Sequence, residues 1–279
     1  MTILVIGGCH TYGHGLNGHP SFIDQFTKQL AHPDRSVSVS HYALVDLHQL
    51  TTLLAVLPLN QYDLILLQLG HYRLQHPPSF GSLLTPARKS SGEQPRAFAP
   101  LTTDDLARLR QTPILTPDTR LPVGNYLKTK LKLGILRGLT STRKLARLNE
   151  VDHDLRALLT QLWPHRRRTV LLTPFTHLEP VSRFLRQRGR QLFLQQGGQQ
   201  GFPVFDTDRV IRPSPAYFLT NDGGHLNAGS HELLGRTLYA FYKTHFGPEA
   251  GQRGAHALPH PNAKRPSRER LGRALSQTS

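Results

Sequence analysis

Short apolar runs alternate with segments of helical period along the first seventy residues. Residues 3–6 form a continuous apolar run, and residues 63–69 (DLILLQL) are apolar apart from Asp63 and Gln68. Both segments are followed by glycine, a pattern typical of strands buried on both faces. Residues 37–44 alternate as a strand, and the spacing of apolar residues predicts helices over 21–30 and 47–57. Strands separated by helix-length segments favour parallel pairing with right-handed crossovers.

The same alternation returns in the second half of the chain. Helices are predicted over 152–163, 180–194 and 228–246, with strands over 169–173 and 202–205. Together with the first half, these elements predict an α/β fold: a three-layer α/β/α sandwich around a central, mostly parallel sheet of about five strands.

Composition divides the chain into one domain, an insertion and a tail. We predict a single α/β domain over 1–246. Residues from about 71 to 125 are rich in proline, serine and threonine, too long for an ordinary connection, and are expected to form an insertion or lid with a short helix over 104–110. Residues 247–279 lack an apolar period and are expected to be a basic, disordered tail.

Several compositional features limit the class of protein. The single cysteine excludes an internal disulfide, the N-terminus lacks a basic region of the signal-peptide type, and no run approaches the roughly 20 apolar residues of a membrane span. A cytoplasmic protein is expected. The net charge of +16 predicts non-specific attraction to polyanions. Its excess lies mainly in 128–147, 166–190 and 253–273, which are interpreted as solvated faces and a tail.

Candidate chemistry gathers in loops that follow predicted strands. Cys9 comes within three residues of the first strand, and Asp222 and His225 precede the final helix. A nucleophile on such a loop can be exposed and can meet a base from a later loop. Cys9 as nucleophile, His225 as base and Asp222 as the group that orients the imidazole form a candidate triad. The plainer alternatives are a buried structural cysteine, a capping aspartate and a solvated histidine.

These blocks resemble the SGNH/GDSL-type hydrolases. That family has Gly-Asp-Ser after its first strand and Asp-x-x-His before its last helix. Asp222 and His225 match the last block, while ILVIGGCHTYG has Gly8 in place of the aspartate and Cys9 in place of the nucleophilic serine. The resemblance implies a flavodoxin-like sheet and a hydrolase or acyltransferase acting on an acyl ester of a small molecule or polysaccharide.

The resemblance also points to groups that would hold the oxyanion. The family uses the N–H of the nucleophile, a glycine after the second strand and an asparagine after the third. Here Asp46, or Ala43, lies near the glycine position, and Tyr72 stands in place of the asparagine, with Gly70 and His71 beside it as further candidates for contact with the substrate. Loss of one such donor typically costs roughly 100- to 1000-fold in turnover, so a weak esterase is expected.

Other readings of the sequence remain open. The departures at the oxyanion positions also suit an inactive binding protein of the same fold that holds an acidic ligand such as a polysaccharide or nucleic acid. The glycine motif at 13–18 satisfies G-x-G-x-x-G, but it starts six residues after the strand and is followed by His19-Pro20, which disfavours dinucleotide binding. His10, His14 and His19 are expected to be solvated rather than to bind a metal, and no cofactor is predicted. The oligomeric state stays open.

Overall fold

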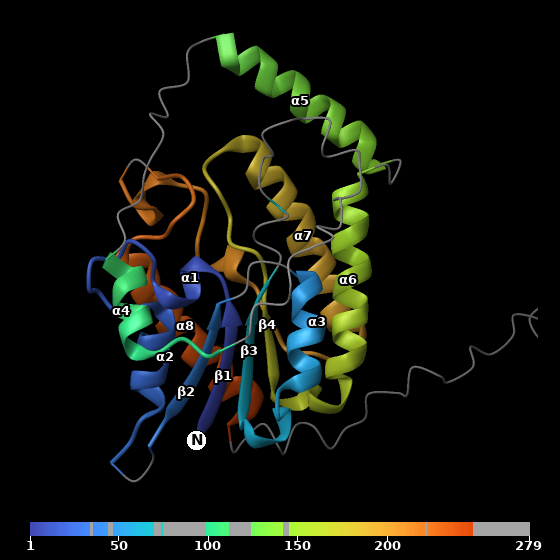
Figure 1. The fold of residues 1–279 in the computed structure, drawn as a ribbon. Helices are drawn as coiled ribbons and strands as arrows, with labels where there is room; N and C mark the ends of the chain where they lie inside the picture. Colours follow the sequence, from blue (N-terminus) through green and yellow to red (C-terminus); the bar gives the residue numbers. More distant parts are fainter. Residues whose placement is uncertain are drawn as a thin grey trace, which may run out of the picture.

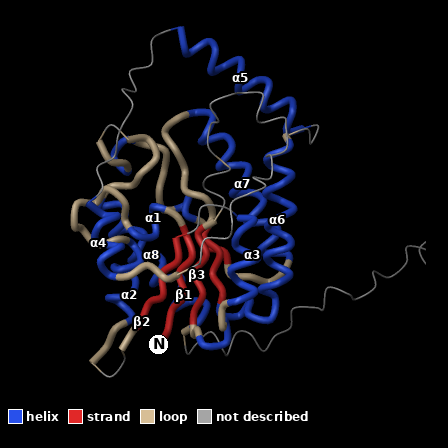
Figure 2. Tube along the Cα trace, in the orientation of Figure 1, coloured by secondary structure: helices blue, strands red, loops and turns tan. Residues whose placement is uncertain are grey.

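The computed structural model describes residues 1–33, 36–43, 47–69, 74, 99–111, 124–141, 145–220 and 222–247. In this part of the chain a five-stranded, fully parallel sheet has the order β2-β1-β3-β4-β5 (Figure 1). The strands are β1 (Thr2–Gly7), β2 (Ser38–Ala43), β3 (Leu64–Gln68), β4 (Thr169–Leu172) and β5 (Val204–Phe205). Helices flank both faces (Figure 2), so the predicted three-layer α/β/α class is confirmed.

Each face of the sheet has its own helices and its own core. On one face lie α2 (Phe22–Leu30) and α8 (Ala228–Phe246), which pack against each other. On the other lie α3 (Leu47–Val56), α6 (Ala146–Leu162) and α7 (Pro180–Gln199). The remaining helical segments are α1 (Cys9–Tyr12), α4 (Thr103–Gln111), α5 (Gly124–Ser141) and the 3-10 turns Leu59–Gln61, Trp163–Arg168, Thr207–Arg209 and Pro215–Tyr217.

The central strand β1 explains why the apolar run is continuous. Ile3 and Val5 pack against the α2 and α8 side, whereas Leu4 and Ile6 pack against the α3 and α6 side, and all four are fully buried. A strand covered on both faces needs apolar residues at every position. Because all the strands are parallel, their carboxyl ends open at the same edge of the sheet, where the loop after β1 lies.

The helix boundaries differ from the predictions in two places. Helix α6 begins at Ala146 rather than 152, because Leu148 and Val151 continue its buried face. Helix α7 extends to Gln199, because Gln196 and Gly197 remain buried against the sheet. Helix α4 forms where a short helix was predicted. Most of the predicted insertion at 71–125, and the tail beyond residue 247, lie outside the described residues.

The contact between α2 and α8 depends on Gly235. A Cβ added there would collide with Cβ of Gln25 and lie 2.9 Å from the carbonyl oxygen of Phe22. We expect Gly235→Ala to lower the free energy of unfolding by about 1 to 3 kcal/mol, because the two helices would have to separate. The matched control is Gly134→Ala in α5, where an added Cβ meets open space.

The control should stabilise the protein by roughly 0.5 to 1 kcal/mol, because alanine has the higher helix propensity. Urea denaturation of both variants measures the difference. Equal effects of the two substitutions would contradict the close approach of α2 and α8.

Candidate active site

Cys9 is placed by a tight turn from β1 into α1. Gly7 is required at the end of the strand, because an added Cβ would collide with the methyl group of Thr11 and lie 3.1 Å from Cβ of Gln68. The N–H of Gly8 donates to Oε1 of Gln68 (3.2 Å), and the Thr11 hydroxyl donates to the carbonyl oxygen of Gly8 (2.7 Å). Cys9 therefore begins α1 at the carboxyl edge of the sheet, with 8% of the residue exposed.

Asp222 and His225 form one compact loop ahead of α8. Oδ1 of Asp222 accepts hydrogen bonds from the backbone N–H groups of Gly224 (2.6 Å) and His225 (3.1 Å). Oδ2 of Asp222 lies 2.6 Å from Nδ1 of His225. The spacing of three residues thus brings the Asp222 carboxylate next to the His225 imidazole. This contact at Nδ1 directs Nε2 of the ring away from Asp222.

The structure brings Cys9 to this imidazole. The Cys9 side chain lies close enough to the His225 ring to affect its protonation. Burial alone would lower the pKa of His225, but the hydrogen bonds to Asp222 and Cys9 and the negative charges of these groups raise it to about 9. Burial would likewise raise the pKa of Asp222, but the hydrogen bonds and positive charge of His225 and the N–H of Gly224 lower it to about 2. At neutral pH the imidazole is therefore protonated and the carboxylate ionised.

A buried arginine lies beside the same three groups. Arg186 of α7 is 1% exposed, and its Nη1 donates to the carbonyl oxygens of Phe175 (3.3 Å) and Thr176 (3.1 Å). Burial lowers its pKa to about 10, and the negative charges of Cys9, Glu179 and Asp222 act against that change. The guanidinium therefore remains charged at neutral pH and adds a fixed positive charge near the sulfur.

Arg186 was not predicted, because the basic stretch 166–190 was interpreted as a solvated face. The buried side of α7 provides the missing signal. Val181, Leu185 and Phe193 share a helical face with Arg186, so an arginine at that position must be buried.

Two of the three clustered histidines are not solvated, contrary to the prediction. His10 is 1% exposed, with its ring centroid 5.6 Å from that of His225 and 4.7 Å from that of Phe175. His14 is half-buried, and its ring centroid lies 5.0 Å from that of His225. Only His19 is exposed. His10 lies within α1 beside Cys9, whereas His14 follows left-handed Gly13 (φ 77°), which ends α1 and reverses the chain direction.

The glycine motif at 13–18 serves this turn. Gly13, Gly15 and Gly18 all have positive φ angles, of 77°, 75° and 88°, where glycine is favoured. The segment ends before Ser21, which caps α2 by accepting from the N–H of Asp24. These glycines have a conformational role of their own, without a nucleotide.

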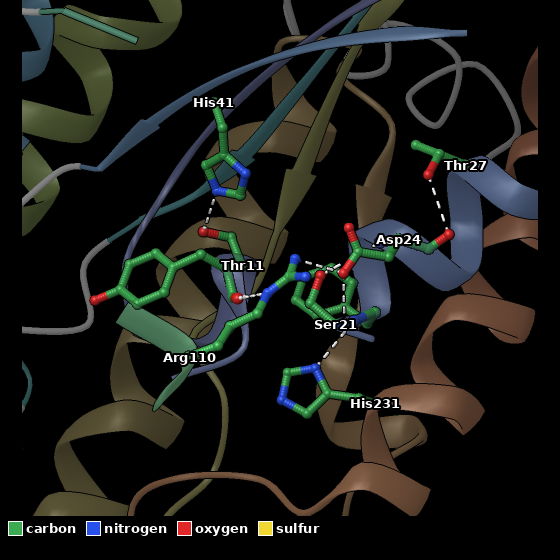
Figure 3. A network of polar contacts seen from close by, with 9 residues as sticks. Thr11, Ser21, Asp24, Thr27, His41, Arg110 and His231 are labelled. Atoms are coloured by element: carbon green, nitrogen blue, oxygen red, sulfur yellow. Dashed lines mark hydrogen bonds and ion pairs between the residues drawn. The ribbon is translucent and has the colours of Figure 1, made fainter. Parts of the chain in front are cut away.

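Helix α4 packs onto the loop that carries Cys9. Arg110 donates to the carbonyl oxygen of Tyr12 (2.8 Å) and forms an ion pair with Asp24 (2.5 Å; Figure 3). Nδ1 of His14 lies 3.1 Å from the carbonyl oxygen of Leu109. A segment from the predicted insertion is thus attached to the site by polar contacts, on the side where His14 meets His225.

A pocket of about 510 Å³ adjoins the other side of Asp222. Its apolar wall includes Leu178, Phe218 and Leu219, and its polar lining includes His177. Burial and the positive charge of Arg186 lower the pKa of His177 to about 4, so this imidazole is neutral. In the described ranges, no group of three or more His, Cys, Asp or Glu side chains is arranged to hold a metal ion.

Of the predicted oxyanion and substrate candidates, the structure places only Ala43, which is exposed at the end of β2 and pairs with Gly7 of β1. Asp46, Gly70, His71 and Tyr72 lie outside the described residues. Of the residues near the turn after β1, the structure adds Gln68, which is 2% exposed and holds the N–H of Gly8 through its carbonyl oxygen. The candidate triad is therefore described at the side chains of Cys9, His225 and Asp222, and the other half of the site stays a prediction.

The fold is similar to those of solved hydrolase structures. A lipase/acylhydrolase from Enterococcus faecalis is similar with a TM-score of 0.51 and 12% sequence identity, covering 87% of this chain and 95% of that one. A variant of an acetyl xylan esterase from Geobacillus stearothermophilus is similar with a TM-score of 0.50 and 15% identity, covering 86% and 93%. No protein-family model matches the chain, and neither does any curated protein.

At these identities the similarity concerns the fold. It extends over most of this chain and over more than nine-tenths of each of the two matched chains. The chain therefore has the fold of the SGNH/GDSL-type hydrolases, as the two sequence blocks around Cys9 and His225 predicted.

Proposed function

We propose that the protein hydrolyses an acyl ester, or transfers its acyl group, through a triad of Cys9, His225 and Asp222. The observation that carries the proposal is the contact of the Asp222 carboxylate with Nδ1 of His225, together with the Cys9 side chain beside the same imidazole. Two proteins with a similar structure are named a lipase/acylhydrolase and an acetyl xylan esterase, which supports an ester as the substrate class.

In the first half-reaction the Cys9 thiolate attacks the ester carbonyl carbon. A carbon–sulfur bond forms and the carbon–oxygen bond to the alcohol breaks, giving a thioester on Cys9. The leaving alkoxide takes a proton from the His225 imidazolium, which Asp222 holds in the required orientation. The raised pKa of His225, about 9, suits a general acid that is charged at neutral pH.

In the second half-reaction His225 acts as the base. The now neutral imidazole removes a proton from water, or from an acceptor alcohol, as its oxygen attacks the thioester. The carbon–sulfur bond breaks, the thiolate returns, and the acid or new ester leaves. Arg186 keeps its positive charge through both steps because its pKa, about 10, remains well above neutral pH. Two carbonyl oxygens hold the guanidinium in place, so it stabilises the returning thiolate.

Trapping the acyl-enzyme tests this proposal. The protein is mixed with 4-nitrophenyl acetate, quenched in acid and measured by intact-mass and peptide mass spectrometry. We expect one acetyl group on the peptide that contains Cys9, and none there in Cys9→Ala, because this chain has no other thiol. A hydroxylamine wash should remove the acetyl group, as expected for a thioester.

Two outcomes would contradict the triad. Equal turnover of the ester by the intact protein and by Cys9→Ala would remove Cys9 from the reaction. Absence of both turnover and adduct across a panel of acetyl and longer acyl esters would favour the inactive binding protein of the same fold. Circular dichroism and a thermal melt of Cys9→Ala confirm that the variant remains folded.

A further inference from the structure

Helix α5 presents an apolar stripe to the solvent. Leu127, Leu131 and Ile135 follow each other at intervals of four residues and are 74%, 66% and 43% exposed. In the described residues seven large apolar side chains are at least 38% exposed, and three of them lie on this one helix. Such clustering differs from the single exposed apolar residues that any protein surface has.

The opposite side of α5 fixes the helix to the domain. Leu136 is fully buried in the core on the α3, α6 and α7 side, and Leu133 and Leu139 pack partly buried against the same core. Helix α5 also contacts α7. The exposed stripe is therefore the outward face of a helix that packs on the domain. Its apolar side chains are held in a fixed position on the surface.

Positive charge borders the stripe on both sides. At 100° per residue, Lys128 lies on one edge of the apolar face, and Lys130 and Arg137 lie on the other. The sequence contains no aspartate or glutamate between residues 119 and 149. An apolar ridge between two basic edges is the pattern of a helix that lies in the interface of a membrane with anionic lipids.

We propose that α5 is such an interfacial helix and docks the protein on an anionic membrane surface. Such a helix matches the surface of an anionic membrane. Its apolar side chains can insert between the lipid acyl chains, while the cations on both edges of the stripe contact the negative headgroups. Figure 1 shows α5 beyond the carboxyl ends of the strands, so docking turns the Cys9 edge of the sheet toward the lipid. The proposal goes beyond the esterase activity and does not rest on it.

Vesicle sedimentation tests the proposal with the full chain. Vesicles of phosphatidylcholine with phosphatidylserine are compared with vesicles of phosphatidylcholine alone. We expect binding to the anionic vesicles that weakens as salt is added. The double variant Leu127→Gln/Leu131→Gln keeps the net charge and should lose at least about 10-fold in partitioning, since two leucines no longer insert.

The matched control removes two exposed apolar side chains elsewhere. Val56 on α3 and Leu233 on α8 are 72% and 41% exposed, and Val56→Gln/Leu233→Gln should bind as the unaltered protein does. Equal binding by the α5 variant would overturn the proposal, because charge alone, including that of the basic tail, would then account for binding.

Other outcomes would also overturn the proposal. Failure of the unaltered protein to bind anionic vesicles would do so. A dimer in sedimentation velocity that dissociates in Leu127→Gln/Leu131→Gln, without vesicle binding, would assign the stripe to a second copy of the chain.

Discussion

Replacing His225 by glutamine is expected to lower kcat/KM for an alkyl ester by at least about 10³-fold, because the leaving alkoxide and the attacking thiolate lose the same partner. The loss should be smaller for a 4-nitrophenyl ester, whose leaving group needs no proton. Asp222→Asn should also reduce kcat/KM strongly, because a neutral amide does not stabilise the imidazolium and its NH2 group can donate to Nδ1, which favours the wrong tautomer. Because the three groups act as a unit, the double variant should be little worse than His225→Gln alone.

The pH profile gives this prediction a second readout. With the pKa of His225 raised to about 9 by Asp222 and Cys9, kcat/KM for the alkyl ester should fall as the pH rises through about 9, since the imidazolium loses its proton. This fall in kcat/KM at high pH should be absent for the 4-nitrophenyl ester. His153→Gln, at an exposed position of α6, is the control and should leave both rates unchanged. Equal losses on both esters would indicate that His225 does not protonate the leaving group.

The fold could be predicted from the sequence because its strands are covered on both faces. Residues 3–6 and 64–67 are apolar at every position, as a parallel strand that is covered on both faces requires. Helix boundaries were less certain, since the start of α6 depends on burial of Leu148 and Val151 against neighbours far along the chain. Local spacing specifies which elements form, whereas their ends depend on tertiary contacts.

The candidate site, too, could be predicted only in part. The pairing of Asp222 with His225 follows from a spacing of three in one turn, which the sequence displays directly. Arg186 and His14 reach the site through contacts made by α7 and by the turn after α1, so nothing adjacent to them in the sequence marks their role. The approach of Cys9 to His225 joins loops more than two hundred residues apart, and it was suggested by their positions after predicted strands and by the resemblance to a known family.

Acidification is expected to unfold the protein well before its carboxylates are neutralised. His41 and His231 are buried at 4% and 1% exposure, and burial lowers their pKa values to about 4 and 3; burial, with Arg186, lowers that of His177 to about 4. In the unfolded chain each titrates near 6.5, so below that pH the unfolded state binds more protons. Three uncompensated protons reduce the free energy of unfolding by roughly 4 kcal/mol per pH unit between about pH 6 and 4.5.

The titration of His225 lowers the free energy of unfolding on the alkaline side of neutral pH. Its pKa is raised, so the stabilisation from its contacts with Asp222 and Cys9 is complete below pH 6.5 and is lost as the pH rises through about 9. Stability measured by urea denaturation should therefore peak between about pH 6.5 and 7. A stability that stays level down to pH 4.5 would contradict the buried, neutral state of these imidazoles.

His231 offers the sharpest test of this acid dependence. Its Nδ1 accepts the N–H of Phe22, the first residue of α2, and only the neutral ring can accept a hydrogen bond at that nitrogen. His231→Asn keeps a side-chain acceptor but removes the titration, so the slope of stability against pH should fall by about 1.4 kcal/mol per pH unit. The exposed His153→Asn should leave the slope as it is. If both variants keep the original slope, protonation of His231 is not what opens the contact between α8 and α2 in acid.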